Sequence, residues 1–240
     1  MQQQRSPRQY TGIAARGILM GAADAVPGVS GGTIAFMTGI YEELIFSLKQ
    51  CGSAPKVLVK QGIAAAWEHM NAWFLLALFS GIIVSILTVS RIVLYLLAFY
   101  PVLLWSFFFG LILAAVWSVI RHVEKWSTSV IFAFVFGAVS AFLITTITPT
   151  NIESTPLIVF ASGMIAICAM ILPGISGSFI LLLLGMYAPM LAAVKELQLA
   201  TLVIFAAGCV AGLLSFSHVL TWMFSRFKTL TLALLGGFML

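Results

Sequence analysis

The sequence predicts an all-α integral membrane protein, built as an inverted repeat in which two re-entrant helical hairpins meet near the middle of the bilayer. Two observations carry this prediction. Of the 240 residues, 62% are hydrophobic and only 8% are charged, and the mean hydropathy is +1.13. A chain with so little charge cannot cover a globular domain with polar groups, so we place it in the membrane. The second observation is an internal duplication.

The duplicated motif reads Val-Pro-Gly-Val-Ser-Gly at residues 26–31 and Leu-Pro-Gly-Ile-Ser-Gly at residues 172–177. Each copy is followed at the same interval by Gly-Ile-Tyr (39–41) or Gly-Met-Tyr (185–187). Proline and glycine interrupt helices, and unwound backbone survives inside a bilayer only where protein surrounds it or where it lines a wet cavity. Paired interruptions in two halves of a chain point to a transport site. The expected hairpin turns are Pro27, Gly28, Pro173 and Gly174.

The first repeat is expected to span residues 1–126 and to begin with a hairpin at about 10–48. Charged residues lie close to its turn, with Arg16 and Asp24 before it and a pair of glutamates after it. The apolar arms between these charges are too short for full crossings, because a spanning helix needs about 20 apolar residues. This hairpin is therefore predicted to dip into the bilayer and to return to the same face.

Two further regions complete the first repeat. Residues 55–70 mix three charged residues with apolar side chains, which predicts an interfacial helix lying on the membrane surface. Residues 72–120 contain uncharged runs, and these predict membrane helices at about 72–90 and 102–120, joined by a short segment before Pro101.

The second repeat is expected to span residues 127–240, with a membrane helix at about 128–148, a hairpin at about 156–194 and membrane helices from about 198. The arms of its hairpin are long enough to span, so a re-entrant and a fully spanning arrangement both stay open. The final uncharged run, 229–240, is too short to cross the bilayer. We expect that the sequence ends inside a helix and that this repeat is truncated at the C-terminus.

The two hairpins are predicted to enter the membrane from opposite faces. Each hairpin returns to the face from which it starts, and three crossings lie between them, so the repeat is inverted. Charge gives independent support, because most cations then fall on one face, which the positive-inside rule makes cytoplasmic. The protein is thus predicted to be multi-pass with a cytoplasmic N-terminus. The cations on that face are Arg5, Arg8, Arg16, Lys49, Lys56, Lys60, Arg121, Lys125, Arg226 and Lys228, against Arg91 and Lys195 on the other.

Several ligand classes find no support in the sequence. The three cysteines and three histidines are scattered along the chain, so neither a disulfide framework nor a metal site is predicted. We expect no cofactor and no nucleic-acid partner. Gly208 and Gly212, four residues apart, permit a close helix contact, either inside the chain or in a homo-oligomer.

The two motif regions resemble the polyprenyl-phosphate transporter family of bacteria and archaea, whose members are also called undecaprenyl-phosphate translocases. The resemblance is carried by Gly21–Phe36, Gly39–Glu42, Leu172–Ser178 and Gly185–Tyr187. With the hydropathy pattern it covers most of the chain, although family members usually carry additional C-terminal hydrophobic sequence. It implies a flippase of the bacterial inner (plasma) membrane, which returns undecaprenyl phosphate from the outer to the inner leaflet for recycling in cell-wall and other envelope polymer synthesis.

The residue types in the two motifs suit a phosphate head group. Carrying its charge through hydrocarbon is costly, whereas the polyprenyl tail can stay in lipid. A helix that begins at mid-membrane presents unpaired N–H groups and the positive end of its dipole, which attract an anion. Glycine lets the backbone approach closely, and hydroxyls donate further hydrogen bonds. The predicted phosphate-binding residues are Ser30, Gly31, Gly32, Thr33, Ser176, Gly177 and Ser178.

The charged residues near the first motif each have two possible roles. Arg16 is a candidate counter-charge with fork geometry for phosphate, or it extends to the cytoplasmic interface. Asp24, Glu42 and Glu43 are candidate proton carriers that couple transport to a proton gradient, since a carboxylate beside a phosphate repels it unless protonated. In the other reading Asp24 caps a turn and the glutamates mark an interface. None of the three has a counterpart in the second copy.

Other functions were weighed on the same residues. Gly28–Gly32 matches the G-x-S-x-G pattern of serine hydrolases, but it lacks the preceding strand and a nearby histidine with an acid. A membrane lipid phosphatase would bind a similar substrate, yet no cluster of basic residues with histidine is visible. An ion or small-anion channel stays open as an alternative, because paired re-entrant hairpins also form pores. The sequence thus predicts a transporter and not an enzyme.

Overall fold

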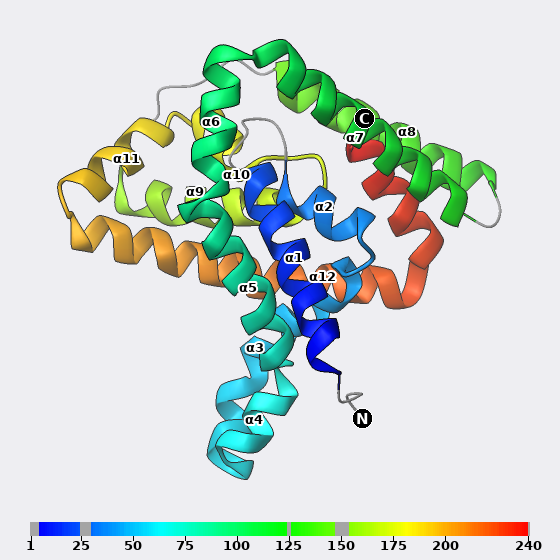
Figure 1. Ribbon diagram of the computed structural model, residues 1–240. Coiled ribbons are helices and arrows are strands. Elements are labelled where there is room, and N and C mark those ends of the chain that lie inside the picture. The colour runs from blue at the N-terminus through cyan, green and yellow to red at the C-terminus, as the bar shows by residue number, and fades with distance from the viewer. Residues whose placement is uncertain (1–4, 25–29, 124–125, 147–153, 240) are drawn as a thin grey trace.

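The computed structural model describes residues 5–24, 30–123, 126–146 and 154–239 (Figure 1). All regular secondary structure in these ranges is helical, which confirms the all-α prediction. The helices are α1 (Pro7–Asp24), α2 (Gly31–Met37), α3 (Tyr41–Gln61), α4 (Ile63–His69), α5 (Ala72–Leu87), α6 (Val89–Phe99), α7 (Pro101–His122), α8 (Thr128–Thr146), α9 (Pro156–Ile171), α10 (Gly177–Leu183), α11 (Tyr187–Lys195) and α12 (Leu199–Phe238).

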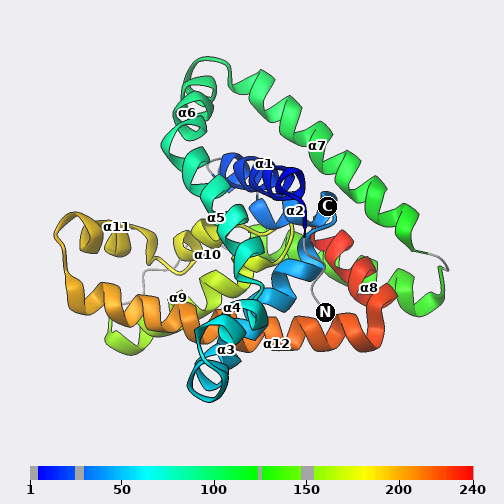
Figure 2. The ribbon, with the colours of Figure 1, turned by 60° about the horizontal axis from the view of Figure 1, so that its bottom comes forward.

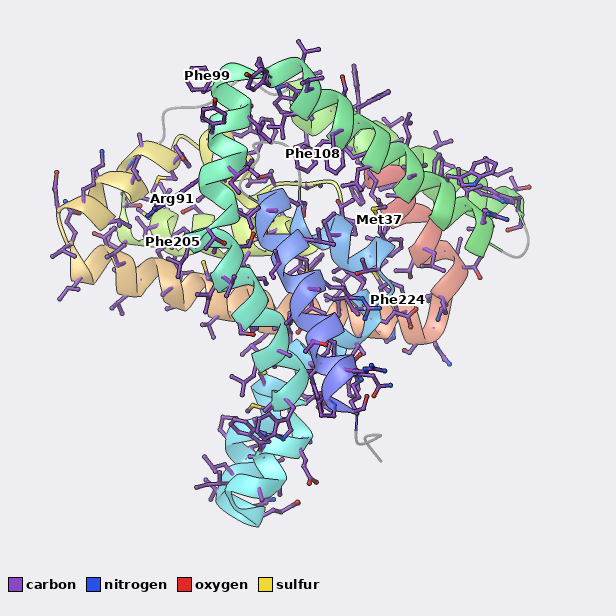
Figure 3. The ribbon with its side chains drawn as sticks, in the orientation of Figure 1. Met37, Arg91, Phe99, Phe108, Phe205 and Phe224 are labelled. Carbon is purple, nitrogen blue, oxygen red and sulfur yellow. The ribbon has the colours of Figure 1, made fainter. Side chains whose placement is uncertain are left out.

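The helices have the length and surface of a membrane protein. In the described part of the chain, α8 and α12 are each long and apolar enough to cross a bilayer. Up to three more spans arise if α4 with α5, α6 with α7, and α10 with α11 are each taken as one bent span. Large apolar side chains are exposed along α6, α7 and α8, among them Phe99 at the outer edge of the fold in Figure 3. Such a surface suits contact with lipid, and the chain is an integral membrane protein.

The duplicated motif folds into the same local structure twice. Helices α2 and α10 have seven residues each and begin and end at corresponding positions of the repeat. Each is followed by a glycine in the left-handed region, Gly39 with φ of +72° and Gly185 with φ of +67°. The N–H of the residue after each glycine donates to a carbonyl five residues back, at 3.0 Å in the first copy and 2.8 Å in the second. This is the Schellman helix end, which favours glycine because other residues adopt positive φ at a cost.

Equivalent helix pairs pack through glycine in the two halves. Helix α1 crosses α5 where Gly17 faces the carbonyl of Leu78, and α9 crosses α12 where Gly163 faces the carbonyl of Phe205. A Cβ atom would lie 2.1 Å from the first oxygen and 2.5 Å from the second. Both pairs lie side by side in Figure 1. Small residues let helix backbones approach closely in membranes, so the sequence repeat is also a repeat of packing.

Helix α12 has two parts with different neighbours. Its first part packs along α9, and the helix then bends at Phe227, whose φ of −138° and ψ of 48° are not helical. The last turns pack on α8 and reach the second motif, where a Cβ on Gly174 would lie 2.2 Å from the carbonyl oxygen of Phe238. Figure 2 shows this final arm turning back toward α2. The short final run seen in the sequence is therefore the end of a longer, bent helix.

Two boundaries differ from the sequence prediction. The segment expected as one interfacial helix at 55–70 is divided between the end of α3 and α4, and this part of the chain extends away from most of the other helices in Figure 1. Pro55 lies inside α3, and the helix ends at its C-cap residue Gly62. The φ of Gly62 is +86°, a value that glycine adopts without strain. The segment before Pro101 forms a helix of its own, α6, because proline is well tolerated as the first residue of the next helix.

Alanine substitution at two helical glycines tests the packing of α9 against α12. A Cβ at Gly208 would lie 2.1 Å from the carbonyl oxygen of Phe160, whereas a Cβ at Gly110 in α7 would meet nothing within 4 Å. We expect Gly208→Ala to lower the free energy of unfolding by about 1–3 kcal/mol through overpacking, and Gly110→Ala to be neutral or stabilising by up to about 1 kcal/mol through helix propensity. Thermal unfolding in detergent measures both. Equal effects of the two substitutions would contradict the close crossing.

Candidate functional site

The two repeated motifs lie against each other where their helices are broken. We call these regions the tips, namely residues 30–33 in the first copy and 173–178 in the second. The backbone N–H of Gly174 donates to the Thr33 hydroxyl at 2.9 Å. The Tyr41 hydroxyl donates to the carbonyl oxygen of Ile171 at 3.1 Å, and the Ser30 hydroxyl lies 3.5 Å from the carbonyl oxygen of Met170. Side chains of the first copy thus bind backbone groups of the second. The expected turn residues Pro27 and Gly28 lie outside the described residues, while Pro173 is buried beside Gly174.

The tip of the first copy is closed by its own chain. The Asp24 carboxylate accepts the N–H of Gly31 at 2.7 Å, and the Ser30 hydroxyl, as N-cap of α2, accepts the N–H of Gly32 at 3.1 Å. A Cβ on Gly31 would lie 2.5 Å from Asp24, and one on Gly32 would lie 2.9 Å from the Ile171 carbonyl oxygen. These glycines are therefore needed for close packing, and their N–H groups are already engaged.

The tip of the second copy is open by comparison. Met170 occupies the position that corresponds to Asp24, and Ser176 makes no capping hydrogen bond to the start of α10. Instead the Ser176 and Ser178 hydroxyls lie 2.9 Å apart, with Ser178 exposed. Within the described part of the chain, the N–H groups of Gly177 and Ser178 meet no hydrogen-bond acceptor. The backbone at the start of α10 thus has N–H groups that the described residues leave without an acceptor.

A cavity of about 510 Å³ adjoins the two tips, and we call it the hydroxyl cavity. Its polar lining includes the hydroxyls of Ser30, Thr33 and Thr145, and Gly174 lies at its edge. A smaller hollow of about 120 Å³ shares Gly174 and Thr145 with it and reaches Ser176. The Thr33 oxygen accepts the N–H of Gly174, and its hydroxyl donates to no residue that the structure describes, so its proton is available to a ligand. The remaining walls of the hydroxyl cavity are apolar, namely Ile112, Ala138, Val139, Ala141, Phe142, Phe238 and Met239.

The predicted proton carriers are held by other polar groups. The Asp24 carboxylate accepts the N–H of Gly31, the first residue of α2. Glu43 accepts two hydrogen bonds from the Arg5 guanidinium, both at 2.7 Å, and one from Asn71 at 2.7 Å. The hydrogen bonds between Arg5 and Glu43 raise the pKa of the Arg5 guanidinium. Glu42 pairs with Lys228 at 2.7 Å.

A second cavity, of about 540 Å³, lies beside these glutamates, and we call it the glutamate cavity. It is lined by Phe36, Met37, Thr38, Gly39, Tyr41, Glu42, Glu43, Ala115, Lys228 and Leu232. The Glu42–Lys228 pair therefore stands at its wall, so this cavity holds charge of both signs while the hydroxyl cavity holds neutral polar groups.

Arg16 is not brought to either cavity. It is half-buried on α1 and makes no ion pair with a described residue. Arg16 precedes Asp24 by eight positions, so it lies about 12 Å from the end of α1 at the usual helical rise. Its place as a counter-charge to phosphate stays a prediction.

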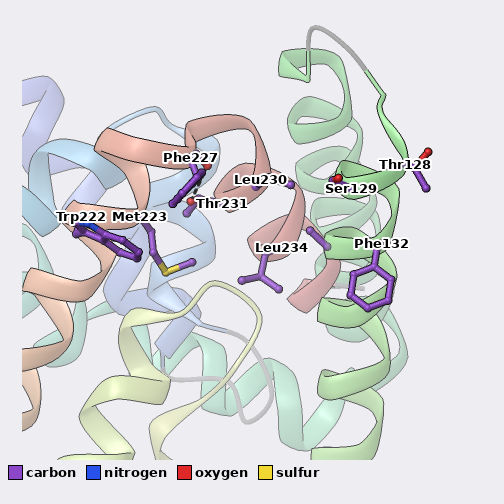
Figure 4. Close-up of a pocket in the computed structure, with 10 residues that line it drawn as sticks. Thr128, Ser129, Phe132, Trp222, Met223, Phe227, Leu230, Thr231 and Leu234 are labelled. Carbon is purple, nitrogen blue, oxygen red and sulfur yellow. Dashed lines mark hydrogen bonds between the residues drawn. The ribbon is translucent and has the colours of Figure 1, made fainter.

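A third cavity, of about 620 Å³, lies at the bend of α12 beside the start of α8 (Figure 4). Its hydroxyls, Thr128, Ser129 and Thr231, are spread among rings and aliphatic chains such as Trp222 and Phe132. It contains none of the residues predicted to bind phosphate. In addition, no group of three or more histidine, cysteine or acidic residues that could hold a metal ion occurs among the described residues.

Tyr41 is a residue of this region that the sequence does not single out. It is 2% exposed and bonds the other repeat, whereas Tyr187, at the corresponding position of the second copy, is 45% exposed. The two tyrosines have the same motif around them, so no local signal separates them. Only the contact between the repeats distinguishes their roles.

These features define an integral membrane protein whose broken helices meet beside a polar cavity, as in transporters with discontinuous helices. The chain belongs to the VCA0040-like family, described as undecaprenyl phosphate translocase-like, whose family model matches residues 20–240. This membership confirms the resemblance seen in the two motifs.

Two relatives support the assignment. The chain is 52% identical over 232 residues to a polyprenyl-phosphate transporter of Vibrio cholerae serotype O1, an alignment that covers 96% of this chain and 75% of the relative. It is 32% identical over 242 residues to a polyprenyl-phosphate transporter of Staphylococcus aureus, covering 93% of this chain and 81% of that relative. No solved structure matches the chain.

The two tyrosines provide a matched test of the contact between the repeats. Tyr41→Phe leaves the buried carbonyl of Ile171 without its donor, so we expect the free energy of unfolding to fall by about 1–3 kcal/mol. Tyr187→Phe, at the exposed counterpart, should change it by less than about 0.5 kcal/mol. Thermal unfolding of both variants in detergent decides the matter, and equal stability of the two variants would argue against the role of Tyr41.

Proposed function

We propose that this protein is a lipid-carrier translocase that returns undecaprenyl phosphate from the outer to the inner leaflet of the bacterial inner membrane, for recycling in envelope polymer synthesis. Membership of a translocase-like family and the names of the two relatives support a polyprenyl phosphate as the cargo. The observation that carries the proposal is the hydroxyl cavity beside the meeting helix tips. We further propose that the repeats are inverted across the membrane and that the N-terminus is cytoplasmic.

The two parts of such a lipid place different demands on the protein. The phosphate is charged and cannot cross hydrocarbon without partners, whereas the isoprenoid tail is itself apolar and can remain in the bilayer. A cavity of about 510 Å³ with a few hydroxyls in an otherwise apolar lining is suited to shelter the head group alone. The exposed apolar surface of α7 and α8 is available to the tail.

In this proposal both copies contact the phosphate. The Ser176 and Ser178 hydroxyls hydrogen-bond each other, so one of their two protons is available to a ligand, together with the N–H of Gly177. The first copy adds the hydroxyls of Ser30 and Thr33, which line the cavity, while Gly31 and Gly32 hold the frame through contacts that are already made. Charge-assisted hydrogen bonds to an anion are stronger than those between neutral groups, so these few hydroxyls suffice for recognition.

Proton coupling belongs to the proposal through Asp24. This carboxylate bonds Gly31 at the start of the same short helix whose residues Ser30 and Thr33 line the hydroxyl cavity. A phosphate that enters the cavity brings like charge toward Asp24, which favours uptake of a proton by one of the two groups. Movement of the head group and of a proton would then be linked.

Reconstitution into liposomes tests the function. With polyprenyl phosphate placed in one leaflet, we expect the purified protein to move the lipid to the other leaflet without changing it, and a proton gradient to alter the rate. Release of inorganic phosphate would indicate a phosphatase, and ion flux without lipid would indicate a channel. If the lipid keeps its sidedness with and without the gradient, the translocase proposal is wrong.

A double substitution tests the site. Ser30→Ala with Ser176→Ala removes one hydroxyl from each tip, and we expect binding of polyprenyl phosphate to weaken by about 1–3 kcal/mol, the cost of lost hydrogen bonds to a charged group. Ser80→Ala, an exposed serine on α5 whose hydroxyl bonds the carbonyl of Ala77, is the control. Isothermal binding in detergent measures both. Unchanged affinity in a folded double variant would show that the tips do not bind the phosphate.

A further inference from the structure

The hydroxyl cavity and the glutamate cavity lie at opposite ends of α2. Ser30 and Thr33, at its start, line the hydroxyl cavity, and Met37, at its end, lines the glutamate cavity. Helices α7 and α12 provide further walls to both cavities. From α7, Ile112 lines the first cavity and Ala115 the second, and the final arm of α12 contributes to each. The two cavities are therefore consecutive chambers along one short helix.

A small apolar cluster separates the chambers. Ala115, Val116 and Met239 are buried together, and Met37 and Ile112 are among the side chains packed against them. Members of this cluster line both sides, because Met37 and Ala115 border the glutamate cavity while Ile112 and Met239 border the hydroxyl cavity. In Figure 3, Met37 lies at the end of α2 next to the last turns of α12. The cluster is thus the wall between two chambers that both contain polar groups.

We propose that the phosphate head group travels along α2 from one chamber to the other, and that Met37, Ala115 and Met239 form the closed gate of this path. The inference rests on the proposed function and adds to it the route and the residues that control passage. A charged head group cannot pass an apolar constriction without partners, so the gate keeps it in one chamber until the wall opens.

The parts of the gate differ in how they can move. Methionine is unbranched and flexible, so Met37 and Met239 can leave the path by changing rotamer. Helix α2 has only seven residues and ends at the left-handed Gly39, which allows it to shift as a unit. Ala115 is fully buried on the longer helix α7 and has no side-chain rotamers. It therefore forms the fixed side of the gate.

The chamber beyond the gate offers the phosphate a cation. Lys228 pairs with Glu42 at 2.7 Å, and the two side chains are 59% and 51% exposed. Exposed ion pairs are weak, so a phosphate can take the place of Glu42 beside Lys228. The path thus leads from a chamber of neutral hydroxyls to a chamber in which Lys228 can exchange Glu42 for the phosphate.

Two alanines one residue apart on α7 test the gate. Ala115→Phe places a ring in the path, whereas Ala114→Phe adds the same ring on the exposed side of the helix. We expect Ala115→Phe to bind polyprenyl phosphate within about twofold of the unmodified protein but to move it between leaflets at least tenfold more slowly, and Ala114→Phe to retain both activities. Transport by a folded Ala115→Phe variant at the unmodified rate overturns the gate, while absence of transport by the unmodified protein overturns the proposed function instead.

Thiol labelling gives a readout that does not depend on folding of the Ala115→Phe variant. Thr38→Cys marks the glutamate cavity and Thr145→Cys marks the hydroxyl cavity, each in a protein whose three native cysteines are replaced by alanine. With a charged, membrane-impermeant maleimide we expect the two positions to react from opposite faces of sealed vesicles. Reaction of both from the same face, or of neither, would show that α2 does not separate two chambers and would overturn the path.

Discussion

The hydrogen bond from the Gly174 backbone N–H to the Thr33 hydroxyl is the contact on which the arrangement of the two halves depends. A helix that breaks inside a bilayer exposes backbone groups that water cannot reach, so other parts of the protein must bind them. Here Thr33 accepts the N–H of the second turn, and Tyr41 donates to the carbonyl at the end of α9. Side chains of the first half thus bind one N–H group and one carbonyl at the second break, so the second half depends on the first for these contacts.

A nearly symmetric sequence thus builds an asymmetric site. The position that corresponds to Thr33 is Phe179, and the position that corresponds to Gly32 is Ser178. The first copy carries the side chains that bind its partner, and its own short helix is capped by Asp24 and Ser30. The second copy lacks the acid, and its two serine hydroxyls hydrogen-bond each other. The side chains of the first motif are thus occupied with contacts that hold the fold, whereas the serines of the second motif pair with one another.

Much of the fold was predictable because the strongest signals are local. Proline and glycine mark the breaks, and the equal spacing of Gly39 and Gly185 from the two motifs places the ends of α2 and α10. The division of α3 from α4 at Gly62 was missed, because the charged and apolar residues at 55–70 were interpreted as one interfacial helix. The contacts of Asp24 with Gly31 and of Tyr41 with Ile171 join residues that lie in different helices, and periodicity carries no information on such contacts.

The bent α12 joins two regions that the rest of the chain keeps apart. Its first part packs on α9 through glycines of both helices, and its last turn lies against Gly174, where the Phe238 carbonyl leaves no room for a Cβ atom and a φ of +88° favours glycine. The bend at Phe227 lies between these two contacts, and Phe238 lines the hydroxyl cavity. One continuous helix therefore connects the α9 contact in the second half to a wall of the cavity between the halves.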